Sequence, residues 1–531
     1  MGTGPSCLAE VFVRAVERAP DRTCLHRRIG AQRSRASYLE VARRVASIIA
    51  ALDRLGLRAG DRVATFLDEI HDAVHFALAC AHTRIAAVPL DPRSSPAALR
   101  RLIERTDAAA VFTRVEHLGA CDGLAVPVLV LGAGAAPARA HDLWTDELPD
   151  PDAALATLRA RTAGPDSVYV IQPTSGTTGE PKLMLRTQRP FLRIGRLWQF
   201  THVDAPDHQR RIMVNPLTHG AGVLDLWAGL AAGAELCVPS RPNVDAPLAE
   251  VRALDPHVLV MVPRILRALR RQQLAAGEPP GAPLLGPSAR LFAFGGAPCE
   301  PELQELLLAQ GVEVLEVYGT SETGILVMTP PGARRPGWAG RPFDDVELKL
   351  DEDGELLART PCMMEGYLGA EELTREAYDH EGYYRTGDYA ELDGDGWVRV
   401  LGRKKDVFNT PTGNNIYPAR IEGMLEQLAG VEQAVVIGDG RPYLTALVVL
   451  GPDRARLAEV AEQVRALNAR LEGEERVRRL HALEAPIGAE LYRPVGHGKV
   501  RRERKLIEER YQPAVEALYR DPAPAEIRVV E

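Results

Sequence analysis

The spacing of apolar residues changes along the chain. Between about residues 36 and 297, stretches with helical spacing alternate with short apolar runs such as "RVATFL", "HVLVMVP" and "RLFAFGG". Segments that alternate in this way predict largely parallel β-sheets covered by helices. This part of the chain is therefore predicted to have an α/β fold.

The rest of the chain has a different pattern. After about residue 340, alternating residues punctuated by Asp-Gly turns, as in "DEDGELLART" and "ELDGDGWVRV", indicate antiparallel hairpins. The segment 404–531 mixes short strands with helices. Its final helix is predicted over "KLIEERYQPAVEALY", where Ile507, Tyr511, Val515 and Leu518 recur at helical spacing and would pack against neighbouring elements.

Length and charge exclude several classes of protein. A chain of 531 residues is too long for one hydrophobic core, so two or more domains are expected. The 64 basic and 72 acidic side chains give a net charge of −8, which argues against a general nucleic-acid-binding protein. No secretory signal and no apolar stretch long enough to span a bilayer is apparent. Seven scattered cysteines fit reduced thiols, so we expect a cytoplasmic protein without stable membrane insertion.

The stretch "PTSGTTGEPK", residues 173–182, follows an apolar run directly. Glycine lets the backbone approach a ligand and hydroxyl groups add hydrogen-bond donors, so such a loop suits phosphate oxygens. The residues with these properties are Thr174, Ser175, Gly176, Thr177, Thr178 and Gly179. The loop is not the P-loop of phosphoryl-transfer NTPases, because Pro181 precedes Lys182 and no Ser or Thr follows. Taken alone, it could also be a polar turn.

Five further motifs follow in order along the chain. They are "FGGAP" (294–298), "VYGTSETG" (317–324), "YRTGD" (384–388), "GRKKD" (402–406) and "GHGKV" (496–500). With the loop, they resemble the adenylate-forming superfamily of acyl-CoA synthetases, aryl-acid AMP ligases, adenylation domains and firefly luciferase. The resemblance covers nearly the whole chain. It implies an N-terminal core over 1–402, with two helix-covered sheets and a β subdomain at about 335–402, and a mobile α+β domain over 403–531.

The resemblance also implies an activity. Members of the superfamily join a carboxylate to the α-phosphorus of ATP, release pyrophosphate, and pass the acyl group to a nucleophile, usually a thiol. This chemistry brings two anions together, so positive charge and hydrogen-bond donors are needed around the phosphates. The protein is therefore expected to be an AMP-forming acid–CoA ligase that uses ATP, Mg²⁺ and CoA.

The motifs assign nucleotide-binding roles by resemblance. The loop 174–182 would hold the departing phosphates. Backbone groups lining the adenine site are expected at Gly295, Gly296 and Ala297. Tyr318, followed by Gly319, would stack on adenine. Asp388 would accept hydrogen bonds from both ribose hydroxyls, with Arg403 nearby.

The catalytic roles also follow from the resemblance. Ser321 would contact the α-phosphate, and Glu322 would coordinate Mg²⁺, for which a carboxylate oxygen is a suitable ligand. Lys182 and Lys499 would supply positive charge, and Lys499 would bridge the attacking carboxylate and the α-phosphate during adenylation. A mobile ammonium suits that bridging role better than a planar guanidinium.

Two positions concern the second half-reaction. Lys405 would be the hinge about which the C-terminal domain rotates after adenylation. Gly413 would belong to the face presented after that rotation, where a tunnel for the thiol opens.

The acid and the acceptor stay open at this point. His219 and Gly220 lie where the superfamily lines the acid pocket, although a structural histidine is equally compatible with the sequence. The stretch "KLMLRTQRP" is similar to aryl-acid AMP ligases, whereas "RPYLTALVVL" is closer to long-chain acyl-CoA synthetases. These mixed features suggest a role in specialised biosynthesis. Alternatives are transfer to an amine or a carrier protein, activation of an unusual acid such as nitrite, or a non-catalytic nucleotide-binding relative.

Overall fold

The computed structural model describes most of the chain. The described residues are 5–29, 32–91, 94–131, 140–142, 148–174, 181–197, 209–241, 245–279, 281–297, 299–409, 415–451, 457–488, 491–494 and 500–530.

One large sheet has the strand order β16-β15-β14-β13-β12-β10-β11-β1-β2. Its strands are β1 (Thr23–Ile29), β2 (Gln32–Ser37), β10 (Arg210–Ile212), β11 (Glu235–Val238), β12 (Val258–Val260), β13 (Leu291–Gly295), β14 (Glu313–Thr320), β15 (Gly324–Met328) and β16 (Arg341–Pro342). From β1 through β14 the neighbours pair in parallel, while β2, β15 and β16 pair antiparallel at the edges.

A second large sheet has the order β19-β9-β8-β4-β3-β5-β6-β7. Its strands are β3 (Arg62–Phe66), β4 (Ala86–Pro89), β5 (Ala110–Arg114), β6 (Val128–Leu131), β7 (Ala140–Asp142), β8 (Val168–Thr174), β9 (Lys182–Thr187) and β19 (Gly366–Tyr367). Only β9 and β19 run antiparallel to their neighbours in this sheet. The predicted α/β fold with largely parallel sheets is confirmed.

Helices connect the strands of both sheets. They are α1 (Leu8–Arg18), α2 (Tyr38–Arg54), α3 (Ile70–Thr83), α4 (Pro96–Thr106), α5 (Pro151–Ala160), α6 (Arg189–Leu197), α7 (Gly220–Ala232), α8 (Leu248–Leu254), α9 (Pro263–Ala275) and α10 (Pro301–Ala309). Local sequence sets the start of α2. The Glu40 N–H donates to Ser37 Oγ, and the Ser37 N–H donates to the Glu40 carboxylate, which forms a capping box.

The largest apolar core joins the two sheets. Side chains of α1, α2, α3 and α7 pack there with residues from strands of both sheets. Trp227 of α7 is 1% exposed, and its indole N–H donates to the Tyr169 hydroxyl at 3.2 Å. The Tyr169 hydroxyl donates in turn to the carbonyl of Ala77 at 3.0 Å. These two hydrogen bonds join α7 to β8 of the second sheet, and β8 to α3.

A smaller antiparallel sheet follows in the chain, with the order β17-β18-β20-β21. Its elements are β17 (Glu347–Leu350), β18 (Glu355–Arg359), α11 (Glu371–Glu376), β20 (Tyr384–Leu392) and β21 (Val398–Arg403). Turns at 351–354 and 393–396 join the hairpins, and the N–H of the last glycine donates to the carbonyl of the first aspartate in each turn. Both hairpins predicted from Asp-Gly sequences are confirmed.

The C-terminal segment forms its own sheet, β24-β25-β26-β29, with helices packed against it. Its elements are η4 (Lys404–Asp406), β22 (Phe408–Asn409), β23 (Asn415–Ile416), α12 (Pro418–Glu426), β24 (Val431–Ile437), β25 (Leu444–Leu450), α13 (Leu457–Asn468), β26 (Val477–Leu483), β27 (Tyr492–Pro494), β28 (Val500–Arg502), α14 (Arg504–Arg510), α15 (Gln512–Tyr519) and β29 (Ile527–Val529).

The predicted final helix is wrong in one respect. It is two helices, α14 and α15, which meet at Tyr511. Pro513 has no N–H to donate and its ring would clash with the preceding turn, so it favours the start of a new helix over the continuation of the old one. Ile507, Val515 and Leu518 are nonetheless buried in one apolar cluster, as their spacing predicts.

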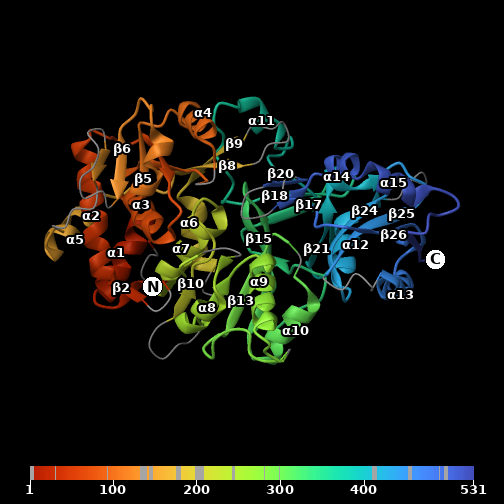
Figure 1. Cartoon of the computed structure of the whole chain (residues 1–531). Coiled ribbons are helices and arrows are strands. Elements are labelled where there is room, and N and C mark those ends of the chain that lie inside the picture. Colours follow the sequence, from red (N-terminus) through yellow and green to blue (C-terminus); the bar gives the residue numbers. More distant parts are fainter. Residues whose placement is uncertain are drawn as a thin grey trace.

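Figure 1 shows how these parts are arranged. The C-terminal elements α12 to α15 and β24 to β26 gather at one end of the molecule, and the small antiparallel sheet lies between them and the two large sheets. In the part of the chain that the structure describes, no helix has the length and apolar character needed to cross a membrane.

Candidate active site

The hairpin between β14 and β15 carries Ser321 and Glu322 at its tip. Two threonines close this turn: the Thr320 N–H donates to Thr323 Oγ1 at 3.1 Å, and the Thr323 N–H donates to Thr320 Oγ1 at 3.2 Å. Hydrogen bonds of this kind, from backbone N–H groups to Thr hydroxyl oxygens, fix local turns. The sequence "TSET" therefore holds the two predicted catalytic residues at the end of a rigid hairpin.

Glycines let the strands below this tip approach closely. A Cβ atom at Gly319 would lie 1.9 Å from the carbonyl oxygen of Gly324, and one at Gly295 would lie 2.6 Å from the carbonyl oxygen of Val317. No side chain fits at either position, so strand packing requires both glycines independently of any ligand. Gly296 and Ala297, which follow β13, are exposed.

Glu322 is linked to Lys182 through Tyr367. The Tyr367 hydroxyl on β19 donates to Glu322 Oε1 at 3.0 Å, and Lys182 Nζ on β9 lies 4.7 Å from the centre of the Tyr367 ring. A cation over an aromatic face is attracted by the electron-rich ring. Glu322 Oε2 has no hydrogen-bond partner among the described residues. The arrangement thus combines a carboxylate that accepts a hydrogen bond at one oxygen, Oε1, with a nearby ammonium group.

Asp388 lies at the centre of a second group. It is 4% exposed, and it pairs with Arg403 across the β20–β21 hairpin. The Tyr318 hydroxyl donates to Asp388 Oδ2 at 2.8 Å, and Arg403 Nε lies 3.0 Å from Oδ1. The Asp388 N–H donates to Thr386 Oγ1 at 3.1 Å. These bonds fix the orientation of the carboxylate between the small antiparallel sheet and β14 of the first large sheet.

The charges in this group influence one another. Burial and then the negative charge of Asp388 raise the pKa of Tyr318 well above its usual value, so its hydroxyl stays protonated and can donate. For Arg403, burial opposes the charge, but the Asp388 carboxylate raises the pKa overall. Tyr318 precedes Ser321 by three residues, so the β14–β15 hairpin contributes one residue to each group, Tyr318 and Glu322.

The acid-binding prediction falls on the start of α7. His219 is the N-cap residue of this helix, and Gly220 is its first residue. The preceding residue is tied to the second sheet, because the Gln172 side-chain amide donates to the carbonyl of Thr218 at 2.9 Å. This bond places the candidate acid-binding segment against β8, which pairs with the strand that begins at Lys182.

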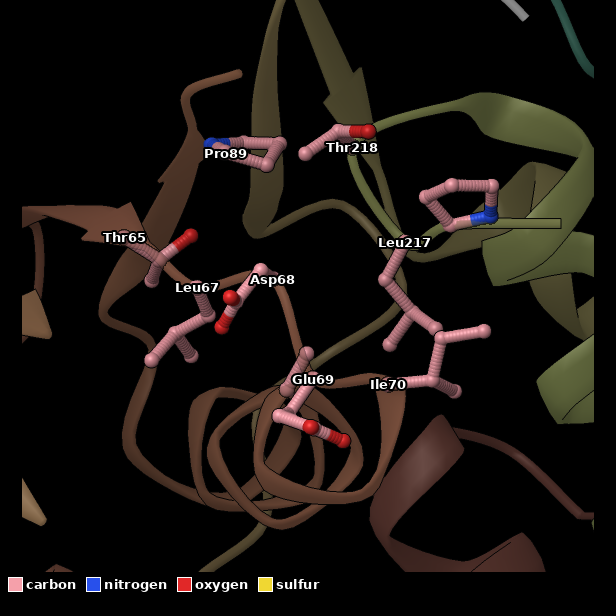
Figure 2. Close-up of a pocket in the computed structure, with 10 residues that line it drawn as sticks. Thr65, Leu67, Asp68, Glu69, Ile70, Pro89, Leu217 and Thr218 are labelled. Carbon is pink, nitrogen blue, oxygen red and sulfur yellow. The ribbon is translucent and has the colours of Figure 1, made fainter. Parts of the chain in front are cut away.

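A pocket adjoins this segment, as Figure 2 shows. It lies at the carboxyl ends of β3 and β4. Its lining residues are Thr65, Leu67, Asp68, Glu69, Ile70, Ala73, Pro89, Pro216, Leu217 and Thr218. The two carboxylates are paired: Asp68 Oδ2 lies 3.2 Å from His117 Nε2, and Glu69 Oε1 lies 2.7 Å from Arg27 Nη2. The remaining lining is mainly apolar.

Other predicted residues have a mixed outcome. Thr174 is the register partner of Lys182 in the β8–β9 hairpin. Lys405 lies in η4, directly after β21, and its neighbour Lys404 forms ion pairs with Asp353 and Glu355 at 2.5 and 3.0 Å. Several predicted residues lie outside the described part of the chain, namely Ser175, Gly176, Thr177, Thr178, Gly179, Gly413 and Lys499.

Sequence reasoning missed two residues of this site. Tyr367 lies in "EGYLG", which fits the superfamily pattern, but nothing in the sequence links it to Glu322. Arg186 lies in "KLMLRTQRP" and is 1% exposed beside the β14–β15 hairpin. An arginine within an otherwise apolar strand was the available signal for the second residue.

The comparison with protein families decides the identity of the fold. The family model of AMP-binding enzymes matches residues 12–368, and the model of the AMP-binding enzyme C-terminal domain matches residues 405–523. The chain belongs to the AMP-binding enzyme family. The predicted adenylate-forming superfamily is thereby confirmed.

Relatives in this family are similar over most of the chain. A CoA ligase of Mycobacterium tuberculosis for 3-[(3aS,4S,7aS)-7a-methyl-1,5-dioxo-octahydro-1H-inden-4-yl]propanoate is 31% identical over 83% of this chain and 89% of its own. A feruloyl-CoA synthase of Amycolatopsis is 31% identical over 76% and 80%. Among solved structures, the adenylation domain of a carboxylate reductase from Mycobacterium chelonae has a TM-score of 0.77 and 22% identity, covering 97% of this chain and 91% of its own.

Proposed function

We propose that the protein activates an organic acid with Mg·ATP, releases pyrophosphate, and transfers the acyl group from the resulting acyl-AMP to CoA. The observation that carries this proposal is a pair of groups, Lys182–Tyr367–Glu322 and Tyr318–Asp388–Arg403, that each take one member, Glu322 or Tyr318, from the β14–β15 hairpin. The two proteins named above that are 31% identical to this chain are a CoA ligase and a feruloyl-CoA synthase, in agreement with the predicted class of enzyme, which is confirmed at that level.

We assign the nucleoside to the Asp388 group. The Asp388 carboxylate keeps acceptor capacity beside its bonds to Tyr318 and Arg403, because each oxygen carries two lone pairs. Ribose hydroxyls can donate to that capacity, while the Tyr318 ring offers a face for the adenine. The exposed backbone at Gly296 and Ala297 leaves room for the edge of the base.

We assign the metal and the phosphates to the Glu322 group. Mg²⁺ prefers oxygen ligands and needs few from the protein when phosphates supply the rest. It fits Glu322 Oε2, which has no hydrogen-bond partner among the described residues. A bound Mg²⁺ would neutralise phosphate charge as the carboxylate attacks. Tyr367 orients the Glu322 carboxylate through Oε1, and Lys182 adds a positive charge near the leaving pyrophosphate.

The remaining roles rest on the resemblance. We propose that loop 174–182 holds the departing phosphates and that Lys499 bridges the carboxylate and the α-phosphate. We also propose that residues 1–402 form the core, that 403–531 form the domain that rotates about Lys405, and that Gly413 lines the thiol path. Lys404 is the neighbour of Lys405 and forms ion pairs with Asp353 and Glu355. Whether these ion pairs break would therefore report on the rotation.

The pocket in Figure 2 supports an organic acid. Its apolar lining beside the His219 segment favours the non-reacting carbon skeleton of such an acid over a small inorganic anion such as nitrite. CoA is the acceptor that we favour over an amine or a carrier protein, because the relatives named above act on CoA.

A panel of acids tests this proposal. Purified protein is supplied with Mg·ATP and fatty, aryl, amino or inorganic acids, first without and then with CoA, and pyrophosphate, AMP and acyl-CoA are measured. We expect acid-dependent pyrophosphate release with one organic class, and acyl-CoA only after CoA is added. Transfer of the acyl group to an added amine or carrier protein, but not to CoA, would contradict the CoA assignment. ATP binding without turnover of any acid would favour the non-catalytic relative.

A further inference from the structure

Arg186 is a buried cation on β9, with a side chain that is 1% exposed. Among the described residues, its Nε and Nη2 atoms have no hydrogen-bond partner. It forms no ion pair with any described residue. Other buried arginines are paired: Arg211 Nε donates to Asp225 at 2.5 Å, and Arg193 Nε donates to Asp345 at 2.6 Å. An unpaired buried charge is costly, so Arg186 requires a functional explanation.

The guanidinium of Arg186 lies between Phe191 and the β14–β15 hairpin of the candidate active site. The guanidinium carbon lies 4.8 Å from the centre of the Phe191 ring. On another side, Nη2 lies 3.6 Å from where a Cβ of Gly324 would be, two residues after Glu322. Lys182 and Arg186 are four residues apart on β9, so strand alternation places both side chains on one face of the sheet.

The charge of Arg186 survives its burial. Desolvation lowers its pKa to about 10, while the negative charge of Glu322 acts in the opposite direction. A group with that pKa is almost fully protonated at pH 7. Because solvent does not screen it, its field extends further than that of an exposed arginine.

We propose that Arg186 is a positioning residue whose buried charge makes the electrostatic potential at the tip of the β14–β15 hairpin more positive. This potential strengthens binding of the anionic nucleotide and weakens binding of a free divalent cation at Glu322. The metal then binds only weakly before ATP and more tightly together with it. This inference rests on the proposed function, because it takes Glu322 as the metal ligand and the tip as the phosphate site.

Removing the charge should change cation binding and nucleotide binding in opposite directions. Arg186→Met keeps a long side chain but removes the charge, whereas Arg186→Lys keeps the charge. We expect the Met variant to bind Mn²⁺ alone more tightly and to bind a non-hydrolysable ATP analogue more weakly, each by on the order of tenfold. The Lys variant should remain within a few-fold of the wild type in both measurements.

Titrations of the full chain provide the test. Mn²⁺ binding is followed by electron paramagnetic resonance of the free ion, and analogue binding by calorimetry, both repeated at high salt, which should leave the effects of a buried charge in place. Weaker binding of both ligands by the Met variant, or unchanged binding of both, would overturn the inference. Thermal unfolding of both variants shows whether they fold, and removal of an unpaired buried charge should not lower stability.

Failure of the proposed function looks different in the same experiment. The wild type would then not bind the nucleotide analogue, or Glu322→Gln would leave Mn²⁺ binding unchanged. A wild type that binds both ligands, with Glu322→Gln weakening Mn²⁺ binding, establishes the site. Equal Mn²⁺ affinity in the wild type and the Arg186→Met variant would then count against Arg186 alone.

Discussion

The two ends of the candidate active site are built differently. At the end that we propose binds the nucleotide, called the nucleotide end, side-chain hydrogen bonds and an ion pair join Tyr318, Asp388 and Arg403, and another hydrogen bond joins Tyr367 to Glu322. At the end that we propose binds the acid, called the acid end, one bond from Gln172 anchors the segment before His219, and the pocket beside it is lined mainly by apolar side chains. Hydrogen bonds fix one geometry, whereas apolar walls can be resized without leaving a polar group unpaired.

This difference indicates where specificity lies. The nucleotide end should tolerate few substitutions, and each substitution there should reduce activity with every acid alike. The acid end should tolerate changes that alter which acid is used. Variants at the two ends therefore separate the two roles.

The largest effect is expected from Glu322→Gln. The amide keeps the shape of the side chain and can still accept from Tyr367, but it removes the charge that a divalent cation requires. We expect pyrophosphate release to fall by about 10²–10³-fold for every acid, comparable to the loss of one major electrostatic contact. The matched control is Glu365→Gln, an exposed acid nearby, which should retain wild-type rates.

A variant of the hairpin comes next. Gly319→Ala would place a Cβ 1.9 Å from the Gly324 carbonyl oxygen, so the strands must separate. We expect a loss of about 1–3 kcal/mol in the free energy of unfolding, measured by chemical denaturation, together with reduced adenylation. Gly423→Ala in α12 has open space and is the control. Equal stability of both variants would show that the hairpin is not constrained as described.

Removing one hydroxyl should have a smaller effect. Tyr367→Phe keeps the ring beside Lys182 but removes the donor to Glu322 Oε1. A hydrogen bond to a charged group contributes about 1.5–3 kcal/mol, and water can replace part of it here, so we expect about a fivefold to tenfold decrease in kcat. Tyr383→Phe, on the small antiparallel sheet, is the control. No change in kcat would remove Tyr367 from the site.

The smallest effect should appear at the acid end. Ala73→Leu enlarges a lining side chain and so narrows the pocket in Figure 2. We expect the KM for bulky acids to rise several-fold, while the KM for ATP and for small acids changes little. An equal change for all acids and for ATP would mean that the pocket does not contact the acid.

Contiguous motifs explain which local features the sequence could predict. In "TSETG" the residues that close the turn, Thr320 and Thr323, are near neighbours in the sequence. Tyr367, by contrast, reaches Glu322 from a remote strand, and the pocket joins segments near residues 67, 89 and 217. Periodicity also missed the break at Pro513, because buried residues keep their spacing across it.

The most direct measurement is acid-dependent exchange between ATP and radioactive pyrophosphate without CoA, in the wild type and in Lys499→Ala. The account predicts rapid exchange in the wild type with one class of organic acid. It predicts loss of exchange in the variant, by about 10²-fold or more, with ATP still bound. Exchange at a near wild-type rate in Lys499→Ala would contradict the assigned role of Lys499, and absence of exchange in the wild type with every acid would contradict the adenylation chemistry itself.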